Sequence, residues 1–281
     1  MANKIFLGSK TYIMGILNIT KDSFVPSSRC NSLEDSLSRA EQIINSGTDI
    51  IDIGAESTRP GSVFVEEKEE IERVIPVVKQ VVRLGIPVSI DTYKSSVAKQ
   101  ALDCGAFIVN DVSGGRDPEM LTLVKEYKSK IVLMHNKIGT HTLPHAKQGS
   151  KENKDIVGEV LQDLEYTASR ALAYGISSES IILDPGIGFQ KNWKDSLRLM
   201  KNINRIKKLG YAILVGASNK EFIGKVLCKE NPEKRQEGTL ACTVISAMQG
   251  ADIVRVHDVK PNVEVAKMTD YIYRNRFPPF H

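Results

Sequence analysis

The sequence predicts an α/β fold, a (β/α)8 TIM barrel that forms a single domain, and three observations support this prediction. Eight short runs of aliphatic and β-branched residues recur along the 281 residues of the chain. Each run is almost continuously apolar, which is typical of parallel strands that are covered on both faces. Amphipathic helical stretches separate the runs, at about 35 residues per strand-helix unit.

The eight predicted strands are short, and each is followed by a polar residue or a glycine. They span residues 12–17, 50–53, 88–90, 108–109, 131–134, 181–183, 212–215 and 253–256. Parallel strands need a crossover connection before they can pair, and the intervening segments are long enough to provide a helix each time.

The segments between the strands each carry an apolar face, and several show helix boundary signals. Ser32 is the expected N-cap of the first helix, and Gly47 is its expected stop. Asp117 and Pro118 place a cap residue and an N1 proline at the start of the fourth helix. Pro76 lies inside the second helical stretch and is expected to kink or restart it. The stretches cover residues 33–44, 71–84, 97–102, 118–127, 157–172, 197–209, 240–248 and 263–272.

A doubly wound open sheet is the alternative arrangement of alternating strands and helices. That fold would usually show a glycine-rich fingerprint after its first strand. The sequence at this position is Asn18-Ile19-Thr20-Lys21-Asp22-Ser23-Phe24, without such a fingerprint. The barrel is therefore favoured, and because no linker interrupts the pattern, residues 1–281 are predicted to be one domain.

The composition excludes several classes of protein. Apolar residues make up 41% of the chain and charged residues 26%, which argues against disorder, collagen and coiled coil. The 38 Lys and Arg residues exceed the 34 Asp and Glu residues by only four, and no clustered basic face points to nucleic acid. The longest apolar runs are strand-sized, so we expect a cytoplasmic protein with neither a membrane nor a nucleic-acid partner.

The four cysteines, Cys30, Cys104, Cys228 and Cys242, show neither C-x-x-C nor zinc-site spacing. We therefore expect buried, unreactive thiols, as in a reducing cytoplasm.

In a barrel, the chemistry lies at the carboxyl ends of the strands, and here every strand end carries polar residues or glycine. One such residue is most often a turn former, but eight in succession converge on one end of the barrel. In chain order they are Asn18, Gly54 with Glu56, Ser57, Thr58 and Arg59, Asp91, Asn110 with Asp111, His135, Asp184, Ser218 with Lys220, and Arg255 with His257.

These residue types indicate two kinds of binding. The acceptors and the amide of Asp91, Asn110 and Asp184 suit a flat heterocycle that carries several N–H groups, because buried carboxylates need donors. The donors Arg59, Lys220, Arg255 and His257 suit a polyanion such as a diphosphate. Arg255 and His257 are two residues apart, so both side chains point to the same side of the strand. Asn18 is a candidate to orient a metal or a phosphate.

The same segments resemble the signature motifs of the dihydropteroate synthase family of pterin-binding enzymes. The resemblance covers nearly the whole chain in the family's order. The matching segments are residues 14–20 with Asp22-Ser23-Phe24, residues 54–61, Ser89-Ile90-Asp91-Thr92, residues 109–115, residues 183–189, Ser218-x-Lys220 and Arg255-Val256-His257-Asp258.

The resemblance implies a cytoplasmic transferase of folate biosynthesis, commonly a homodimer and a target of sulfonamides. Such an enzyme condenses 4-aminobenzoate with 6-hydroxymethyl-7,8-dihydropterin diphosphate and releases 7,8-dihydropteroate and diphosphate, usually with Mg²⁺. Its partners are thus small-molecule substrates.

The resemblance also implies roles for particular residues. Asp91, Asn110, Asp184 and Lys220 match positions that bind the pterin. Asn18 matches the contact to the metal and the diphosphate, and Arg255 and His257 match further diphosphate contacts. The region that binds 4-aminobenzoate corresponds to Thr58, Arg59, Phe189 and Ser218. The implied catalytic residues are Lys220, Asp184, Asp91 and Asp22.

Three positions depart from the family pattern. Residues 25–29 replace a common second aspartate and two glycines, so Asp22 is the carboxylate expected in the first loop. Asn219 stands where arginine is usual, and Gln190 stands where a small residue is usual. None of these changes falls on the residues expected to bind the pterin.

Two alternatives remain beside the synthase. A related pterin-binding barrel that transfers a methyl group to a corrinoid protein would share the Asp and Asn set, but it has no need for Lys220, Arg255 and His257. A non-catalytic pterin binder is the second alternative, because the first loop is altered. The presence of all the residues expected at the leaving group favours the synthase.

Overall fold

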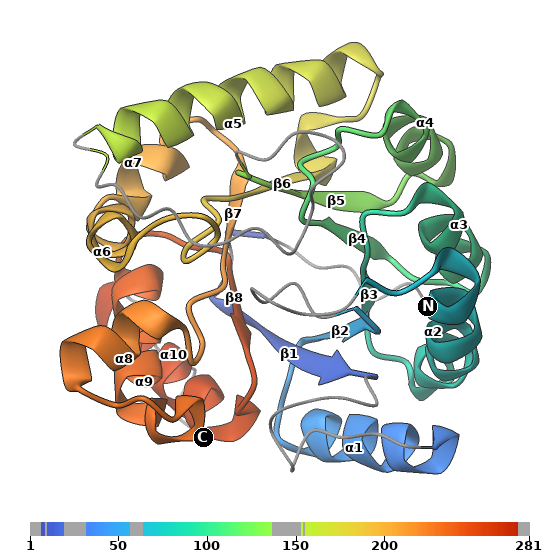
Figure 1. Ribbon diagram of the computed structural model, residues 1–281, viewed down its shortest axis with the longest axis horizontal. Helices are drawn as coiled ribbons and strands as arrows, with labels where there is room; N and C mark the ends of the chain where they lie inside the picture. The colour runs from blue at the N-terminus through green and yellow to red at the C-terminus, as the bar shows by residue number, and fades with distance from the viewer. Residues whose placement is uncertain are drawn as a thin grey trace.

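The computed structural model describes residues 7–8, 10–19, 32–56, 64–136, 153 and 155–274. Eight parallel strands pair in chain order, and β1 pairs with β8 to close the barrel, as the sequence predicts (Figure 1). The strands are β1 (Tyr12–Asn18), β2 (Ile50–Gly54), β3 (Val88–Asp91), β4 (Ile108–Asp111), β5 (Lys130–Met134), β6 (Ile181–Asp184), β7 (Ala212–Val215) and β8 (Ile253–Val256).

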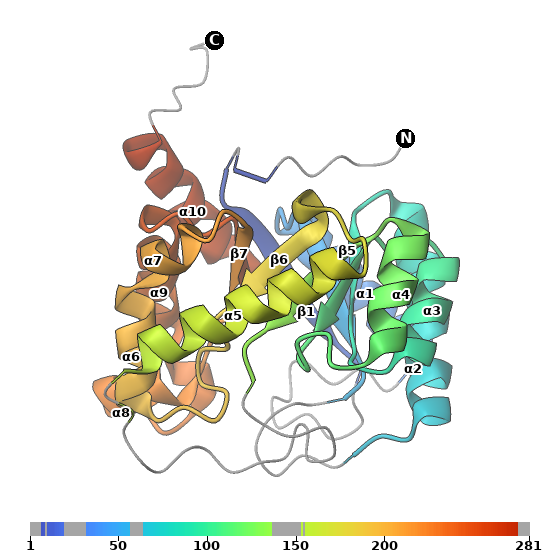
Figure 2. The same cartoon turned by 90° about the horizontal axis from the view of Figure 1, so that it is seen from above.

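The helices surround this barrel, with α2, α3 and α4 on one side and α9 and α10 on the other (Figure 2). Their bounds are α1 (Leu33–Asn45), α2 (Glu67–Val81), α3 (Ser95–Asp103), α4 (Pro118–Tyr127), α5 (Ile156–Ala173), α6 (Trp193–Lys201), α7 (Ile203–Lys207), α8 (Glu221–Leu227), α9 (Gln236–Met248) and α10 (Val259–Tyr273). Short 3-10 helices are η2 (Val82–Leu84), η3 (Ser178–Ser180) and η4 (Pro232–Lys234).

The predicted helix caps are confirmed. The Ser32 side chain accepts a hydrogen bond from the Asp35 backbone, and Asp117 caps α4 in the same way with Pro118 at N1. Pro76 does not restart α2, which runs on to Val81. A proline removes only one helical hydrogen bond, and the buried face of α2 holds the helix against its neighbours.

The stretch predicted as one helix over residues 197–209 is two helices. Asn202 separates them, and its Nδ2 donates to the carbonyl of Arg198 at 2.8 Å. An asparagine side chain that bonds the backbone in this way competes with the helical pattern. The sequence pattern also did not predict α8, a seven-residue helix whose C-cap, Cys228, lies in the left-handed region.

The thiols differ from the expectation that all are buried. Cys242 is buried, and burial raises the pKa of its thiol to about 12. Cys228 is exposed and Cys104 is half-buried, so the expectation is wrong for these two, while Cys30 lies outside the described residues. Cys228 is the left-handed C-cap of α8 and so lies just beyond the helix. The apolar periodicity of the helix therefore gives no indication of whether this thiol is exposed.

Alternate residues of the strands fill the barrel interior. One apolar cluster draws on seven strands, so it occupies the space that the strands enclose. Its buried members are Tyr12, Met14, Ile50, Ile108, Val132, Ile182, Leu214 and Ile253. The other face of each strand packs against the helices in a separate, larger cluster. Among the described helices, none is both long and apolar enough to cross a membrane.

Candidate active site

Four polar residues share the strand face that lines the barrel interior. Each lies two residues after a member of the interior cluster on the same strand. Residues two apart on a strand share a face, so these side chains form the next layer toward the carboxyl end. The four are Asp52, Asn110, Asp184 and Arg255. Asp91 on β3 lies opposite Asn110 in the strand register and joins them.

Arg255 lies at the centre of this layer and bridges two strands. Its Nε donates to Oδ2 of Asp52 at 2.6 Å, and one terminal nitrogen donates to Oδ2 of Asp91 at 2.6 Å. The Nδ2 atom of Asn110 donates to the same Asp52 oxygen at 3.0 Å. Asp52 therefore holds both the guanidinium and the amide in fixed orientations.

Burial and charge shift the pKa values of this group in opposite directions. Burial raises the pKa of Asp91 to about 7, against the attraction of Arg255. Burial alone would lower the pKa of Arg255, but the carboxylates of Asp52 and Asp91 raise it above its ordinary value. The arginine is thus a permanent cation, whereas Asp91 titrates near neutral pH.

Gly54, which ends β2, is needed for this arrangement. A Cβ atom at this position would lie 3.1 Å from Cβ of Asp91. This distance is tighter than ordinary van der Waals contact, so a larger residue would displace the carboxylate.

A second part of the site combines Asp184, Lys220 and Phe189. The Lys220 Nζ donates to the carbonyl of Ile187 and lies 4.3 Å from the centroid of the Phe189 ring. Asp184 accepts the backbone N–H of Gly186 at 2.7 Å. Burial raises the pKa of Asp184, while Lys220 and the Gly186 N–H act against this rise. An acid, a cation and an aromatic face thus lie together.

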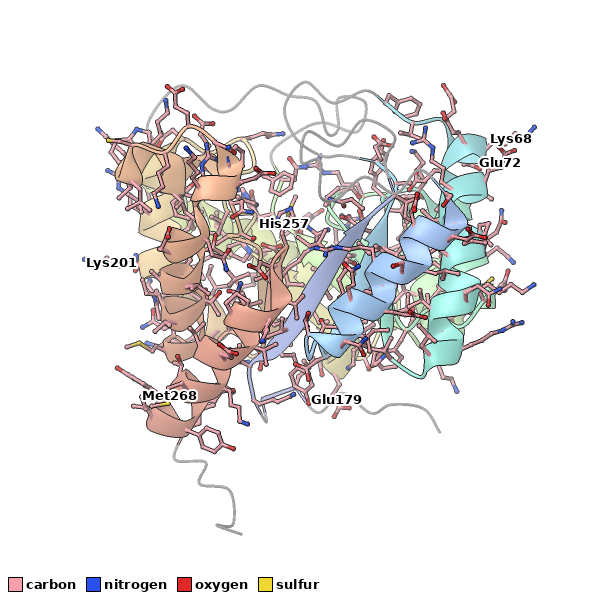
Figure 3. The ribbon with its side chains drawn as sticks, turned by 90° about the horizontal axis from the view of Figure 1, so that it is seen from below. Lys68, Glu72, Glu179, Lys201, His257 and Met268 are labelled. Carbon is pink, nitrogen blue, oxygen red and sulfur yellow. The ribbon has the colours of Figure 1, made fainter. Side chains whose placement is uncertain are left out.

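Ser218 and His257 meet beyond the ends of β7 and β8. The Ser218 Oγ lies 2.9 Å from Nδ1 of His257, and it also accepts the backbone N–H of His257 at 3.3 Å. Figure 3 shows His257 toward one end of the barrel and Glu179, which precedes β6, toward the other end. The sequence placed these two residues in different substrate regions, and the structure brings them into contact.

Two further strand-end residues contact other parts of the chain. Asp111 accepts the backbone N–H groups of Ser113 and Gly115 at 2.7 and 2.9 Å and so closes a turn. His135 turns its Nε2 toward Asp163 of α5, at 3.0 Å from Oδ2. For Asp111, the simple turn-forming role is the correct one.

The two departures at Gln190 and Asn219 share a backbone feature. Both residues adopt the left-handed conformation, with φ of 50° and 57°. Asparagine tolerates this region better than most residues, whereas an unbranched side chain such as glutamine pays a steric cost there. Of the two, the asparagine at position 219 suits this geometry better than the glutamine at position 190.

Several predicted site residues lie at the edge of, or beyond, the described structure. Asn18 ends β1, where its half-buried side chain lies opposite Gly54 in the register. Asp22, Thr58 and Arg59 lie outside the described residues. Among the described site residues, the structure brings Arg255 to Asp91, Lys220 to Phe189 and Ser218 to His257.

The prediction from sequence missed Asp52 and Lys191. Asp52 is fully buried, and its position two residues after Ile50 is the signal that would have revealed it. Lys191 is 2% exposed, and its Nζ donates to the carbonyls of Gly186 and Phe189 at 2.9 and 3.1 Å. It shapes the loop between Asp184 and Phe189, a role that no spacing in the sequence indicates.

Comparison with known proteins shows which family the chain is similar to. The family model described as "Pterin binding enzyme" matches residues 14–257. A dihydropteroate synthase of Clostridium beijerinckii is 45% identical, over 95% of this chain and 96% of that protein.

Two solved structures are similar over their whole length. The dihydropteroate synthase FolP of Clostridium difficile, determined in the presence of pteroic acid, is 43% identical with a TM-score of 0.87, over 96% of this chain and 100% of that chain. The Yersinia pestis dihydropteroate synthase with a sulfonamide drug is 35% identical with a TM-score of 0.90, over 98% of this chain and 99% of that chain. With this coverage and identity, the chain belongs to the pterin-binding enzymes, in the dihydropteroate synthase family.

Proposed function

We propose that the chain condenses 4-aminobenzoate with 6-hydroxymethyl-7,8-dihydropterin diphosphate, giving 7,8-dihydropteroate and diphosphate. The observation that carries this proposal is the layer of Asp91, Asn110, Asp184 and Arg255, with Lys220 beside it. This layer offers acceptors to a heterocycle and fixed cations to a leaving group within one constellation.

The pterin ring carries several N–H groups, and the acceptors suit them. Because Asn110 gives its NH₂ group to Asp52, its carbonyl oxygen is free of that contact and turns toward the ligand side. Asp91 binds Arg255 through Oδ2, which leaves its other oxygen as an acceptor. Asp184 on β6 adds a third acceptor. The proposal thus assigns pterin binding to Asp91, Asn110, Asp184 and Lys220.

The diphosphate is bound by donors at the same end of the barrel. Arg255 uses two of its five N–H donors on Asp52 and Asp91, and the others suit phosphate oxygens. His257 and Asn18 complete this set in the proposal.

Mg²⁺ fits this part of the site. The Asn18 amide oxygen at the end of β1 is a hard donor, and Mg²⁺ commonly takes one or two protein ligands together with substrate phosphates. Asn18 would hold the ion, which would neutralise charge on the diphosphate.

The reaction is a displacement at the pterin methylene carbon. The C–O bond to diphosphate breaks, the C–N bond to the aniline nitrogen forms, and the nitrogen gives its proton to water. Arg255 and Lys220 stabilise negative charge that develops on the leaving group, because fixed donors need no reorganisation. Asp184 stabilises positive charge that develops at the methylene, which favours a dissociative path. A neutral aniline is already nucleophilic, so no strong base is required.

Phe189 and Ser218 supply an aromatic face and a hydroxyl where 4-aminobenzoate is proposed to bind, together with Thr58 and Arg59. The proposal also makes this chain a sulfonamide target, in line with the sulfonamide complex of the Yersinia pestis relative.

One experiment tests the activity directly. Purified protein is incubated with the pterin diphosphate, 4-aminobenzoate and Mg²⁺, and dihydropteroate and released diphosphate are measured. Stoichiometric formation of both products is the expected result. Pterin binding without product would support a non-catalytic binder, and methyl transfer from methyltetrahydrofolate to a corrinoid protein would support the related transferase.

We also propose a cytoplasmic homodimer. Exposed apolar side chains on the adjacent helices α9 and α10 support an interface, since large apolar patches are uncommon on free surfaces. They are Ile245 at 41%, Met248 at 41%, Met268 at 61% and Ile272 at 61% exposure. Light scattering should give twice the chain mass of 31.1 kDa, and Met268→Asp should shift it toward the monomer.

A further inference from the structure

Lys191 is among the largest fully buried side chains of the described structure, although it ends in a charged group. Its Nζ donates to the backbone carbonyls of Gly186 and Phe189 at 2.9 and 3.1 Å. The carbonyl of His135, which follows β5, lies 3.5 Å from the same nitrogen. Burial of an ammonium is costly unless its donors are bonded. These carbonyls therefore hold the group in place, and it joins the end of β5 to the loop after β6.

The backbone of this loop explains why its carbonyls converge on one nitrogen. Gly186, Gly188 and Gln190 have positive φ angles of 64°, 76° and 50°. Left-handed residues interrupt regular structure, so the carbonyls of the loop are not satisfied by a helix or a strand ladder. The fit around the ammonium is close, since a Cβ atom at Gly186 would lie 3.1 Å from Nζ of Lys191.

Three consecutive residues of the same loop contact Lys220 of the candidate site. The Ile187 carbonyl accepts a hydrogen bond from the Lys220 Nζ. A Cβ atom at Gly188 would lie 2.8 Å from Cδ of Lys220, and the centroid of the Phe189 ring lies 4.3 Å from its Nζ. A shift of the loop would therefore move the Phe189 ring relative to Lys220.

We propose that Lys191 is a positioning residue for 4-aminobenzoate, which fixes the Phe189 ring beside Lys220 by holding the carbonyls of Phe189 and Gly186. This inference rests on the proposed function, in which Phe189 supplies an aromatic face to 4-aminobenzoate. Displacements of about 1 Å at positioning groups can cost on the order of 100-fold in rate.

Asp184 depends less on Lys191 than Phe189 does. Its side chain accepts the N–H of Gly186 at 2.7 Å, but its backbone belongs to β6 and its carbonyl accepts the N–H of His135 at 2.8 Å. The strand therefore holds Asp184 even when the loop moves. Loss of the Lys191 ammonium should thus affect 4-aminobenzoate much more than the pterin diphosphate.

The test is steady-state kinetics of Lys191→Met, which keeps most of the side-chain volume but removes the donors. The KM for 4-aminobenzoate is expected to rise at least tenfold, while the dissociation constant of the pterin diphosphate, measured by calorimetry, changes less than threefold. Lys191→Arg should raise this KM only about threefold, because the cation returns with a different donor geometry.

A double-mutant cycle with Phe189→Leu shows whether Lys191 acts through the Phe189 ring. Residues that act as one unit have effects that do not add in free energy. Phe189→Leu alone should raise the 4-aminobenzoate KM, and addition of Lys191→Met should raise it less than threefold further. If the two effects instead multiply in full, Lys191 does not act through Phe189 and the inference is wrong.

Lys201→Met is the matched control. Lys201 is exposed at the end of α6, on the outside of the barrel (Figure 3), so the same change there should leave both substrates unaffected.

The inference is overturned if every folded Lys191 variant keeps the 4-aminobenzoate KM within twofold of wild type, or if both substrates weaken equally. It is also overturned if neither variant folds, because the lysine would then support the barrel as a whole. Failure of the proposed function is a distinct outcome, since the wild-type protein itself would then form no dihydropteroate.

Discussion

Asp52 accepts a 3.0 Å hydrogen bond from Nδ2 of Asn110 inside the barrel, and this bond determines which way the amide faces. An ionised carboxylate only accepts hydrogen bonds, so the NH₂ group of Asn110 must point toward it. The carbonyl oxygen is then left for a ligand donor. A buried residue that need not touch the substrate thus sets the chemistry that Asn110 presents.

Replacement of Asp52 by alanine should therefore impair pterin binding through Asn110 and Arg255. We expect kcat/KM for the pterin diphosphate to fall on the order of 100-fold, because both groups lose their fixed orientation. Removal of one partner of a buried ion pair should also lower the free energy of unfolding by about 3–5 kcal/mol. Steady-state kinetics and urea unfolding measure the two effects.

Ser89→Ala is the control for this change. Ser89 lies opposite Asp52 in the strand register, and its buried Oγ has no hydrogen-bond partner among the described residues. Its removal should leave both measurements near wild type. If Asp52→Ala behaves as mildly as Ser89→Ala, the orienting role of Asp52 is wrong.

Removal of the Lys220 ammonium should abolish most turnover without unfolding the protein. Lys220→Ala is expected to lower kcat/KM on the order of 1,000-fold, because a preorganised cation beside Asp184 is lost. Lys225→Ala on α8 is the control, since that lysine is 59% exposed and 3.9 Å from its carboxylate partner. Near-normal turnover in a folded Lys220→Ala protein would contradict the site assignment.

Asp91 should give opposite pH dependences to stability and to activity. Its pKa is about 7 in the folded protein and 3.8 as a free side chain, so between these values the folded state binds the proton more tightly. The contribution of this group to unfolding free energy is therefore present at low pH and lost as pH rises to about 7, by up to about 1.4 kcal/mol per pH unit. The ionised form, which pairs with Arg255 and which we propose accepts pterin N–H groups, predominates only above that pH.

Two pH series check this prediction. The kcat/KM for the pterin diphosphate should fall as pH drops below about 7, as expected when a free-enzyme group must be ionised. Asp91→Asn should be poorly active and should lack this part of the pH dependence of urea unfolding. An activity profile that is flat between pH 5 and pH 8 would contradict the assignment.

The strand positions and most of the polar residues at the strand ends could be predicted from the sequence, for a physical reason. Strand positions could be predicted because buried parallel strands are continuous apolar runs, and the ends of these runs already named Asp91, Asn110, Asp184 and Arg255. The same alternation would have identified Asp52 from its spacing to Ile50, had it been applied inside the strand and not only at its end.

Contacts between distant loops could not be predicted in this way. The link between Lys94 and Glu56 joins two loops that periodicity does not relate, and Lys191 acts on carbonyl groups that carry no sequence signal. The division of residues 197–209 at Asn202 likewise depends on one side-chain hydrogen bond, which competes with a helical pattern that is otherwise regular.

Replacement of Gln190 by glycine should stabilise the protein slightly. Its φ of 50° costs a residue with a side chain about 1–2 kcal/mol, whereas glycine loses about 0.4–1 kcal/mol of this gain through the entropy of the unfolded chain. The net gain in unfolding free energy should be about 0.5 kcal/mol. Asn219→Gly should instead destabilise, because the Asn219 side chain accepts from Thr239 at 3.2 Å. Equal effects at the two positions would contradict this account.

Two glycines near the carboxyl ends of β6 and β7 should respond to alanine in opposite ways. At Gly186, with φ of 64°, a Cβ atom would lie 2.2 Å from the carbonyl oxygen of His135. Gly186→Ala should therefore lower the unfolding free energy by about 3–5 kcal/mol, through steric overlap and backbone strain.

At Gly216 nothing lies within 4 Å of the added atom. Because Gly216 lies two residues after Leu214 of the interior cluster, the new methyl group enters the space assigned to the pterin. Gly216→Ala should then fold with unchanged stability but weaken pterin diphosphate binding about tenfold, roughly 1.4 kcal/mol, as measured by calorimetry. Binding at wild-type affinity would show that the ligand does not approach β7 at this point.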